Sequence, residues 1–438
     1  MLNKEAARSI LDKTMAQVGH YATAVLSATE QNTTRFANSE ISQNVAITDM
    51  NLSLTVYDGK KSATCSTNVV TDDGLKELAK DAENLLKYVP EGEFEAFPFS
   101  DEPVQESSSD GSLLKAFGVA ERAKFVKDGV AFIEPGYTAA GALNFNRNVL
   151  AVGDSKKGFR YSAYDYVNFN TVVTHEDGTA GGRECCSYTA PPDILGCFKN
   201  AQATAKAARN AVSPELGART VVLSPLAFAD LMGFVCYMLD AKEVEDGASF
   251  AMGKLGQKVF GENLTVRDDA NHPGLRPLPF DTEGNPRRTL TLIDKGVVAS
   301  YLYDNATAAR QNVKSTGHAS IWGQGGFPAN IVIDGGGQSM EEIIASTEKG
   351  IYINEFHYTN FVNARSLQIT GLTRNGAFLI ENGKLTTPMA TVRFTESMLD
   401  ALRNITAVSN HRELIGTWGG AALVPGVRIE NFHFTSKP

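Results

Sequence analysis

The sequence has no run of about 18 apolar residues, the length that a membrane-spanning helix requires. Cysteine is scarce, with five residues among 438, which is typical of a protein whose thiols stay reduced. Residues 1–8 are charged and lead into an amphipathic pattern, without the apolar core and small-residue cleavage site of a secretion signal. We therefore expect a cytoplasmic protein with no membrane partner.

A cluster of basic residues is also missing. Lysine and arginine together number 41 against 50 aspartates and glutamates, which gives a formal net charge of −9 at pH 7. Proteins that bind the phosphates of a nucleic acid concentrate positive charge on one surface. The sequence therefore predicts no direct nucleic-acid partner.

Length and composition predict a folded protein with more than one unit. A chain of 438 residues exceeds what a single hydrophobic core usually supports, and 42% hydrophobic with 21% charged residues is ordinary for a globular protein. The patterns predict an α+β fold: an N-terminal helix and antiparallel-sheet unit at 1–90, a middle helix–strands–helix unit at 111–217, and a large strand-rich C-terminal unit at 218–438. Residues 89–110, with several prolines and serines, predict a linker or long surface loop.

Local periodicity predicts the elements of the first two units. Apolar residues at helical spacing predict helices at 3–19, 74–88 and 112–128, and another that begins after Pro191-Pro192. Alternation over residues 52–56, followed by Asp58-Gly59, predicts a hairpin.

Residues 225–240 predict a helix that is apolar over most of its surface. An apolar strand pattern at 221–223 precedes Ser224-Pro225, and proline is favoured in the first turn of a helix. A helix of this kind must be buried in its own domain or against a partner. Its apolar residues are Leu226, Phe228, Leu231, Met232, Val235 and Met238.

Five blocks of the sequence resemble signatures of the TldD/PmbA family, in the family's order. The blocks are residues 35–43, 281–286, 295–297, 315–319 and 371–384. The resemblance covers nearly the whole chain and favours the TldE/PmbA branch, once described as a modulator of DNA gyrase. In catalytic members of this metallopeptidase family, a His-Glu-x-x-x-His motif binds zinc on a helix that follows a strand and a turn, as the 225–240 segment does here.

The positions that correspond to this motif carry no metal ligand. Gly233 and Met238 stand at the two histidine positions, and Phe234 stands at the glutamate position. Zinc needs imidazole, thiolate or carboxylate ligands, and hydrolysis adds a carboxylate that moves a proton of the bound water. A small shift of the alignment does not restore the site, because no histidine occurs between His175 and His272. We therefore expect no catalytic residue, metal or cofactor in this chain.

The resemblance implies a function shared with a partner. It predicts a TldE/PmbA-like pseudoenzyme subunit that forms a heterodimer with a zinc-bearing TldD-type subunit, or a homodimer, in a proteolytic complex acting on unstructured peptides. One alternative is a self-sufficient metallopeptidase or hydrolase with a non-standard metal site built from His318, His357 and His411. Another is a peptide-binding regulatory module without catalysis.

Residues 350–360 suggest where a peptide would bind. An alternating strand at 350–354 is followed by a predicted polar and aromatic loop at 355–360. This strand accepts a peptide by strand addition, or it is an interior strand whose edges are already paired; the second interpretation is favoured. The predicted peptide-binding residues are Tyr352, His357 and Arg374, the last pairing with a peptide carboxylate or with Glu381.

Overall fold

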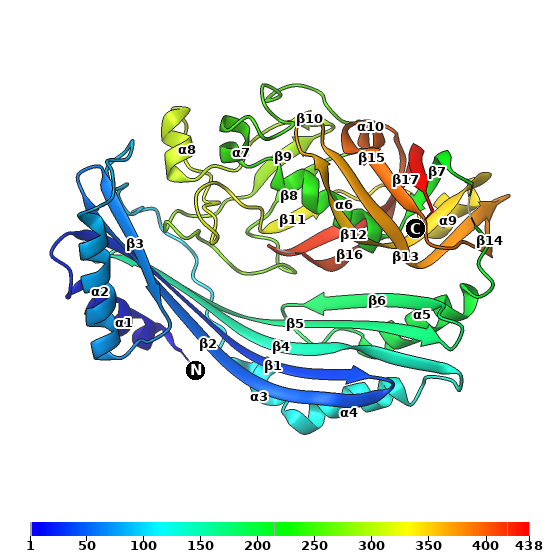
Figure 1. The fold of residues 1–438 in the computed structure, drawn as a ribbon, viewed down its shortest axis with the longest axis horizontal. Helices are drawn as coiled ribbons and strands as arrows, with labels where there is room; N and C mark the ends of the chain where they lie inside the picture. The colour runs from blue at the N-terminus through cyan, green and yellow to red at the C-terminus, as the bar shows by residue number, and fades with distance from the viewer. Residues whose placement is uncertain (1, 214, 418, 438) are drawn as a thin grey trace.

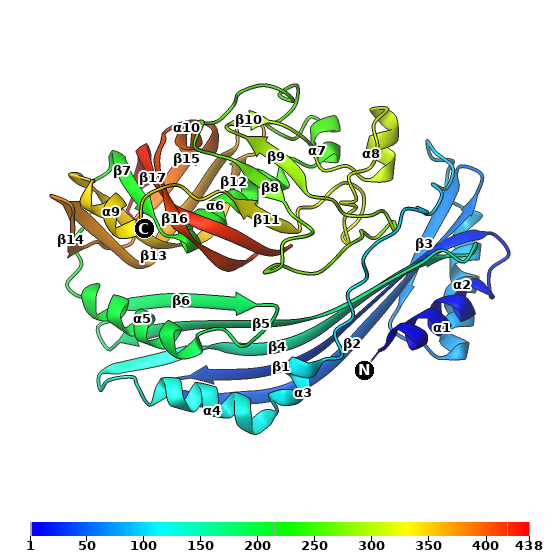
Figure 2. The ribbon, with the colours of Figure 1, turned by 180° about the vertical axis from the view of Figure 1, so that it is seen from behind.

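The computed structural model describes residues 2–213, 215–417 and 419–437 and has the predicted α+β fold. Its strands form two sheets, one of six strands and one of eleven. The six-stranded sheet is long and curved and lies beneath the larger C-terminal unit (Figures 1 and 2). Among the described residues, none of the helices combines the length and apolar character needed to cross a membrane.

The first sheet is antiparallel throughout, in the order β3-β2-β1-β4-β5-β6. Its alternating burial pattern follows from the two-residue period of a strand. The predicted hairpin is confirmed, because Gly59 adopts a positive φ of 56° between β2 and β3. The strands are β1 Tyr21–Ala37, β2 Glu40–Asp58, β3 Lys61–Thr67, β4 Tyr137–Asp154, β5 Phe159–His175 and β6 Ala180–Ser187.

This sheet joins strands from both sides of the 89–110 segment. β1 pairs with β4 from Thr23 to Phe36, so the predicted N-terminal and middle units share one sheet. The domain boundaries themselves stay a prediction. Residues 89–110 hold no helix, as expected of a connection. They are not a free linker, however, because Phe99 and Val104 pack against a small core that contains Leu150 and Phe280.

The helices of the first half cover one face of this sheet. They are α1 Lys4–Met15, α2 Asp72–Leu86, α3 Ser112–Ala116, α4 Val119–Val130 and α5 Ile194–Ala207. The prediction of a single helix at 112–128 is wrong. Phe117 leaves the helical conformation, with φ −115° and ψ 76°, and its ring lies 5.0 Å from that of Phe145 and 5.6 Å from that of Phe125. Packing of Phe117 into the core thus divides the segment into α3 and α4.

The second sheet is mostly antiparallel, as predicted, with parallel pairing of β7 with β12 and of β11 with β17. Its strands are β7 Gly217–Leu223, β8 Val266–Asp268, β9 Leu290–Asp294, β10 Val297–Val298, β11 Asn330–Ile333, β12 Lys349–Asn363, β13 Gln368–Glu381, β14 Lys384–Pro388, β15 Arg393–Ser397, β16 Ile405–Thr417 and β17 Gly420–Ser436. The helices of this unit are α6 Pro225–Tyr237, α7 Ala241–Glu245, α8 Asn305–Arg310, α9 Met340–Ala345 and α10 Met398–Arg403.

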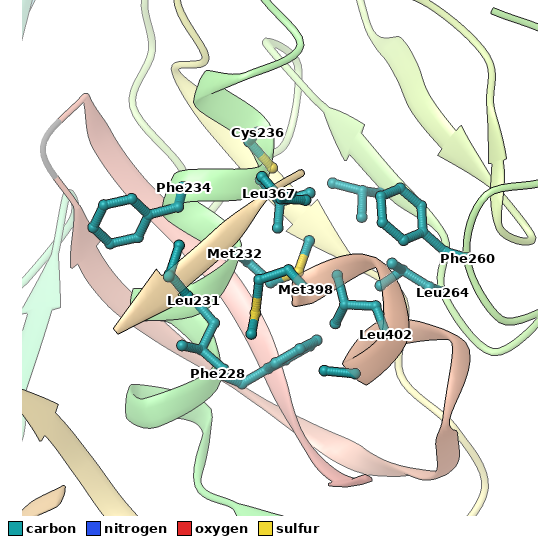
Figure 3. Packing of buried hydrophobic residues seen from close by; sticks show 14 of the residues in the cluster. Phe228, Leu231, Met232, Phe234, Cys236, Phe260, Leu264, Leu367, Met398 and Leu402 are labelled. Atoms are coloured by element: carbon teal, nitrogen blue, oxygen red, sulfur yellow. The ribbon is translucent and has the colours of Figure 1, made fainter. Parts of the chain in front are cut away.

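The predicted apolar helix is confirmed as α6. Its start is fixed by Ser224, whose hydroxyl accepts a hydrogen bond from the Ala227 N–H at 3.1 Å, and by Pro225 in the first turn. One side of α6 packs into the largest core cluster of the molecule. Figure 3 shows the side chains of this cluster, which include Phe228, Leu231 and Met232 of α6, Met398 and Leu402 of α10, and Leu264 and Phe260. The buried position of the helix follows from its composition.

Candidate functional site

A cavity of about 670 Å³ lies where α6 faces strands β5 and β6 of the other sheet. Strands β12 and β16 also line it, together with Ile331 of β11, Ala422 of β17 and residues 327–328. On α6 the lining residues recur at helical spacing, so that one face of the helix points into the cavity. These residues include Ala229, Asp230, Gly233, Cys236 and Tyr237.

Of the three positions that correspond to the zinc motif, only Gly233 lines this cavity. A Cβ atom added to Gly233 would meet no neighbouring atom within 4 Å, so the glycine leaves open space there. Phe234 is 3% exposed and its ring meets that of Phe361 edge to face at 4.9 Å. Met238 is 2% exposed and belongs to the main core. The two remaining positions therefore contribute to packing.

The residues of this site do not fit a zinc ion. Gly233 has no donor atom, and Cys236, which also lines the cavity, has a thiol pKa raised by burial. A raised pKa opposes the thiolate form that binds zinc. Within residues 2–213, 215–417 and 419–437, no group of three or more His, Cys, Asp or Glu side chains is placed to hold a metal ion.

Three half-buried carboxyl groups face the cavity from three different elements: Glu184 of β6, Asp230 of α6 and Glu355 of β12. Burial raises the pKa of Glu184 to about 7, and the charges of Glu355 and Asp230 act in the same direction. Burial also raises the pKa values of Asp230 and Glu355. The cavity therefore gathers carboxyl groups that resist ionisation.

Neutral groups donate hydrogen bonds to two of these carboxylates. The side-chain amide of Asn375 donates to Glu355 Oε2 at 3.0 Å. The hydroxyl of Thr359 donates to Asp230 Oδ2. Both bonds favour the ionised form and lower the respective pKa values against the effect of burial. They satisfy oxygen atoms without neutralising charge.

Two arginines lie near the carboxyl groups of the cavity, Arg183 and Arg374. Arg183, which lines the cavity, forms a salt bridge with Glu413. Arg374 lies opposite Glu355 in the β12–β13 register, and its charge partly opposes the raised pKa of Glu355. Glu381 lies seven residues further along β13, opposite Lys349, and accepts a hydrogen bond from Thr386, so Arg374 does not pair with it.

Sequence reasoning singled out none of Glu184, Asp230 and Glu355 as a site residue, although Glu355 begins the loop predicted at 355–360. One signal could have identified Asp230, because it is the single charged residue between Pro225 and Tyr237 in an otherwise apolar helix. Glu184 and Glu355 lie 171 positions apart by their residue numbers, so only the fold brings them together.

The predicted peptide-binding residues lie around β12 and β13 and do not line the cavity. Tyr352 is half-buried in an apolar cluster, whereas His357 and Arg374 are exposed. Around Tyr352, β12 is paired with β7 on one side and with β13 on the other, so no open edge exists there for strand addition. The loop predicted at 355–360 is wrong, because β12 continues through these residues with irregular register. Peptide binding by the three residues stays a prediction.

The histidines of the alternative metal site have different surroundings. His318 is fully buried, with Nδ1 2.9 Å from the Thr316 carbonyl oxygen and Nε2 3.5 Å from Asp268 Oδ1. His357 is exposed on β12, and His411 lies on β16. No metal-binding group forms from them among the described residues.

His318 belongs instead to a junction of two of the family-like blocks. In this junction Asp281 Oδ2 accepts a hydrogen bond from the Ala319 N–H at 3.0 Å. Gly317 has a φ of 73° and approaches Pro286 so closely that an added Cβ would lie 2.1 Å from the proline carbonyl oxygen. A side chain at Gly317 would therefore be disfavoured both by the positive φ and by a clash with the Pro286 carbonyl oxygen.

Two family models match parts of this chain. A model described as the PmbA/TldA metallopeptidase C-terminal domain matches residues 217–436, and one described as PmbA/TldA metallopeptidase domain 1 matches residues 22–86. The chain belongs to the PmbA/TldD metallopeptidase family.

Individual relatives match over part of their length. The chain is 28% identical to metalloprotease PmbA of Escherichia coli O157:H7 over 47% of this chain and 45% of the relative. It is 30% identical to metalloprotease MJ0996 of Methanocaldococcus jannaschii over 44% of each chain. The chain thus spans less than half the length of these two curated relatives.

Solved structures share the complete fold. The crystal structure of TldE from Thermococcus kodakarensis matches with a TM-score of 0.85 and 19% identity, over 98% of this chain and 99% of that one. A Bacteroides thetaiotaomicron structure, described as a candidate modulator of DNA gyrase, matches with a TM-score of 0.84 and 18% identity over 100% of both chains. At these identities the likeness concerns the fold alone.

Proposed function

We propose that this protein is a non-catalytic, TldE-like subunit of a zinc metallopeptidase complex that processes unstructured peptides. The main observation behind the proposal is that the motif positions on and just after α6 carry no zinc ligand. Gly233 leaves the cavity open where the family motif has its first histidine, and Phe234 and Met238 pack in the core. The zinc and the chemistry of hydrolysis would then come from a TldD-type partner in a cytoplasmic heterodimer.

The retained cavity supports a role in substrate handling. A volume of about 670 Å³ lies within the usual range of ligand pockets, about 300–1,000 Å³. A helix kept only for packing would not need an open space beside Gly233. On this proposal the chain contributes a binding surface and the partner contributes the reaction.

Two alternatives remain. A self-sufficient metallopeptidase requires metal ligands, and the candidate histidines do not form a group among the described residues. A peptide-binding regulatory module would use the same cavity without a catalytic partner. We favour the subunit because the chain belongs to a metallopeptidase family while its own motif positions lack zinc ligands.

The test compares the chain alone, a TldD-type subunit from the same organism alone, and their equimolar mixture. Each sample is analysed for complex formation by size-exclusion chromatography, for zinc content, and for cleavage of an unstructured peptide. The proposal expects a stable complex whose zinc belongs to the partner, and cleavage that requires both chains. Stoichiometric zinc with cleavage by this chain alone would overturn it. A partner with its motif glutamate changed to glutamine serves as the inactive control.

A further inference from the structure

We propose that the cavity beneath α6 binds a positively charged nitrogen group of an extended peptide, namely a lysine or arginine side chain or the terminal amine. The inference deepens the proposed function, since it names the class of substrate group that this chain would hold. It rests on the size of the cavity, the charges along its wall and the side chains that lead away from it.

The cavity suits a long side chain with a charged end. Its volume of about 670 Å³ exceeds what one side chain fills, and part of its wall is apolar, with Met232, Phe356 and Ile415 among the lining residues. Lysine and arginine combine an apolar stem with a charged head, and such stems pack against apolar surfaces. The apolar part of the wall therefore matches the stem.

The charged groups along the wall favour a cation. Among the described lining residues, three are carboxylic acids, Glu184, Asp230 and Glu355, while Arg183 is the one residue with a permanent positive charge. Arg183 is engaged by Glu413, which lies outside the lining. Ionised carboxylates in a partly buried site are costly unless a cation pairs with them. A bound ammonium or guanidinium group would supply the missing charge.

The hydrogen bonds within the site leave this charge in place. Glu355 accepts from the Asn375 amide, Asp230 accepts from the Thr359 hydroxyl, and a backbone N–H of Gly416 favours the ionised form of Glu184. All three donors are neutral. The charges of Arg183 and Arg374 offset part of the effect of burial on Glu184 and Glu355, but no cation acts on Asp230 in this way among the causes of its raised pKa. A cation entering the cavity would add a charge-assisted interaction with these carboxylates.

Asparagine side chains of β5 along the cavity wall favour a peptide as the occupant. Asn168 and Asn170 of β5 line the cavity, and Asn170 lies opposite Glu184 in the β5–β6 register. The amide row continues on the same face of the sheet, where Asn146 Nδ2 donates to Asn168 Oδ1 at 3.5 Å and Asn144 pairs with Asn168 in the register. Asn144 Oδ1 and Asn168 Oδ1 already accept hydrogen bonds from neighbouring side chains. The side-chain amide of Asn170, which lines the cavity, can both donate to and accept from a peptide main chain.

The first experiment measures binding to the purified chain alone. Three short Gly-Ser peptides, blocked at both ends and labelled with an uncharged fluorophore, carry a central Lys, Gln or Glu. A fourth carries Gln and a free terminal amine. Fluorescence anisotropy at low ionic strength is expected to show that the Lys peptide binds about tenfold more tightly than the blocked Gln peptide, and that the Glu peptide binds most weakly.

The fourth peptide distinguishes the source of the charge. Binding as tight as that of the Lys peptide assigns the site to the terminal amine as well, whereas binding like the blocked Gln peptide assigns it to a side chain; either result agrees with the proposal. Equal affinity for the blocked Lys, Gln and Glu peptides, together with no gain from the free amine, overturns it.

Variants then locate the site. Glu184→Gln and Glu355→Gln should each reduce the preference for Lys over Gln several-fold, and the matched control Glu91→Gln, at an exposed residue outside the cavity, should leave it unchanged. A Cβ atom at Gly233 meets no neighbouring atom within 4 Å, so Gly233→Leu directs a larger side chain into the cavity, and the variant should fold and lose binding. A folded Gly233→Leu protein that keeps the Lys preference would exclude the cavity as the site.

The two proposals fail separately. Cation-dependent binding without cleavage by the mixture with a TldD-type subunit leaves the inference standing and removes the proposed function. Cleavage by the mixture, combined with equal binding of all the blocked peptides, does the reverse.

Discussion

The carboxyl groups of Glu184 and Glu355 belong to different sheets and both face the cavity beneath α6. Burial, together with the nearby charge of Glu355, raises the pKa of Glu184 to about 7. The two sheets therefore meet at carboxyl groups whose buried surroundings disfavour the ionised form. This relationship makes both stability and binding depend on pH.

Stability should fall as the pH rises through the range in which Glu184 titrates. In the unfolded chain Glu184 loses its proton near its ordinary pKa, 4.5, whereas in the folded protein it keeps the proton up to a pH of about 7. The folded state then binds more protons than the unfolded state, so the free energy of unfolding decreases with pH between these values. Glu184→Gln removes this term. As the pH is raised from 4.5 to 8, urea unfolding should show that the free energy of unfolding of the variant increases by about 1 kcal/mol relative to that of the original protein. This value is reduced for solvent screening.

The prediction would be contradicted if the free energy of unfolding of Glu184→Gln differed from that of the original protein by the same amount at pH 4.5 and at pH 8. The exposed Glu91→Gln control should show no such pH-dependent gain.

Phe234 should be required for stability rather than for chemistry. It is 3% exposed and packs edge to face on Phe361, so Phe234→Ala removes buried apolar contacts and leaves a cavity. We expect a loss of about 3–5 kcal/mol in the free energy of unfolding. Tyr88→Ala, at an aromatic residue that is 84% exposed, is the matched control and should cost less than about 0.5 kcal/mol. Comparable losses in the two variants would contradict the packing role.

Gly233 should accept a histidine without loss of stability and without gain of zinc. The position is helical and has no neighbouring atom within 4 Å of an added Cβ, so Gly233→His should hold or raise the melting temperature. Phe234 and Met238 still provide no ligands, and atomic absorption should find no stoichiometric zinc. Gly317→Ala is the contrasting control, since a positive φ and the Pro286 carbonyl oxygen make that variant less stable. Stoichiometric zinc in Gly233→His would mean that other ligands are within reach.

His318 and His357 should differ sharply in their contribution to folding. His318 is fully buried beside Asp268, whose pKa is held below its usual range by the charges of His318 and Arg287 despite burial. His318→Ala leaves this buried carboxylate with fewer partners and should lower the free energy of unfolding by about 2–4 kcal/mol. His357→Ala changes an exposed side chain and should stay within about 0.5 kcal/mol. Urea unfolding of both variants provides the measurement, and equal effects would contradict the assignment.

Elements with strong local periodicity were predictable from the sequence. The buried helix α6 and its start at Ser224-Pro225 follow from the apolar pattern and the turn, because both signals lie within a few residues. The break at Phe117 was not predictable, since its cause is a tertiary contact with Phe145. The irregular strand through 355–360 depends on pairing with β13, which a local pattern does not contain.

The candidate site was predictable only in part. Family-like motif positions pointed to Gly233, and this residue does line the cavity. Glu184 and Glu355 show no spacing that links them, because strands from two sheets bring them to the same wall. A polar residue in a buried strand becomes informative only when its neighbours in space are known.

The pairing of β1 with β4 has a consequence for a chain that has been cut. The backbone hydrogen bonds between these strands join residues before and after the 89–110 segment, independently of the covalent connection. Cleavage at the exposed positions 101–103 would therefore leave two fragments held together as one particle. Because the two fragments share this sheet, we expect the protein to reassemble from separately produced fragments divided at residues 101–103.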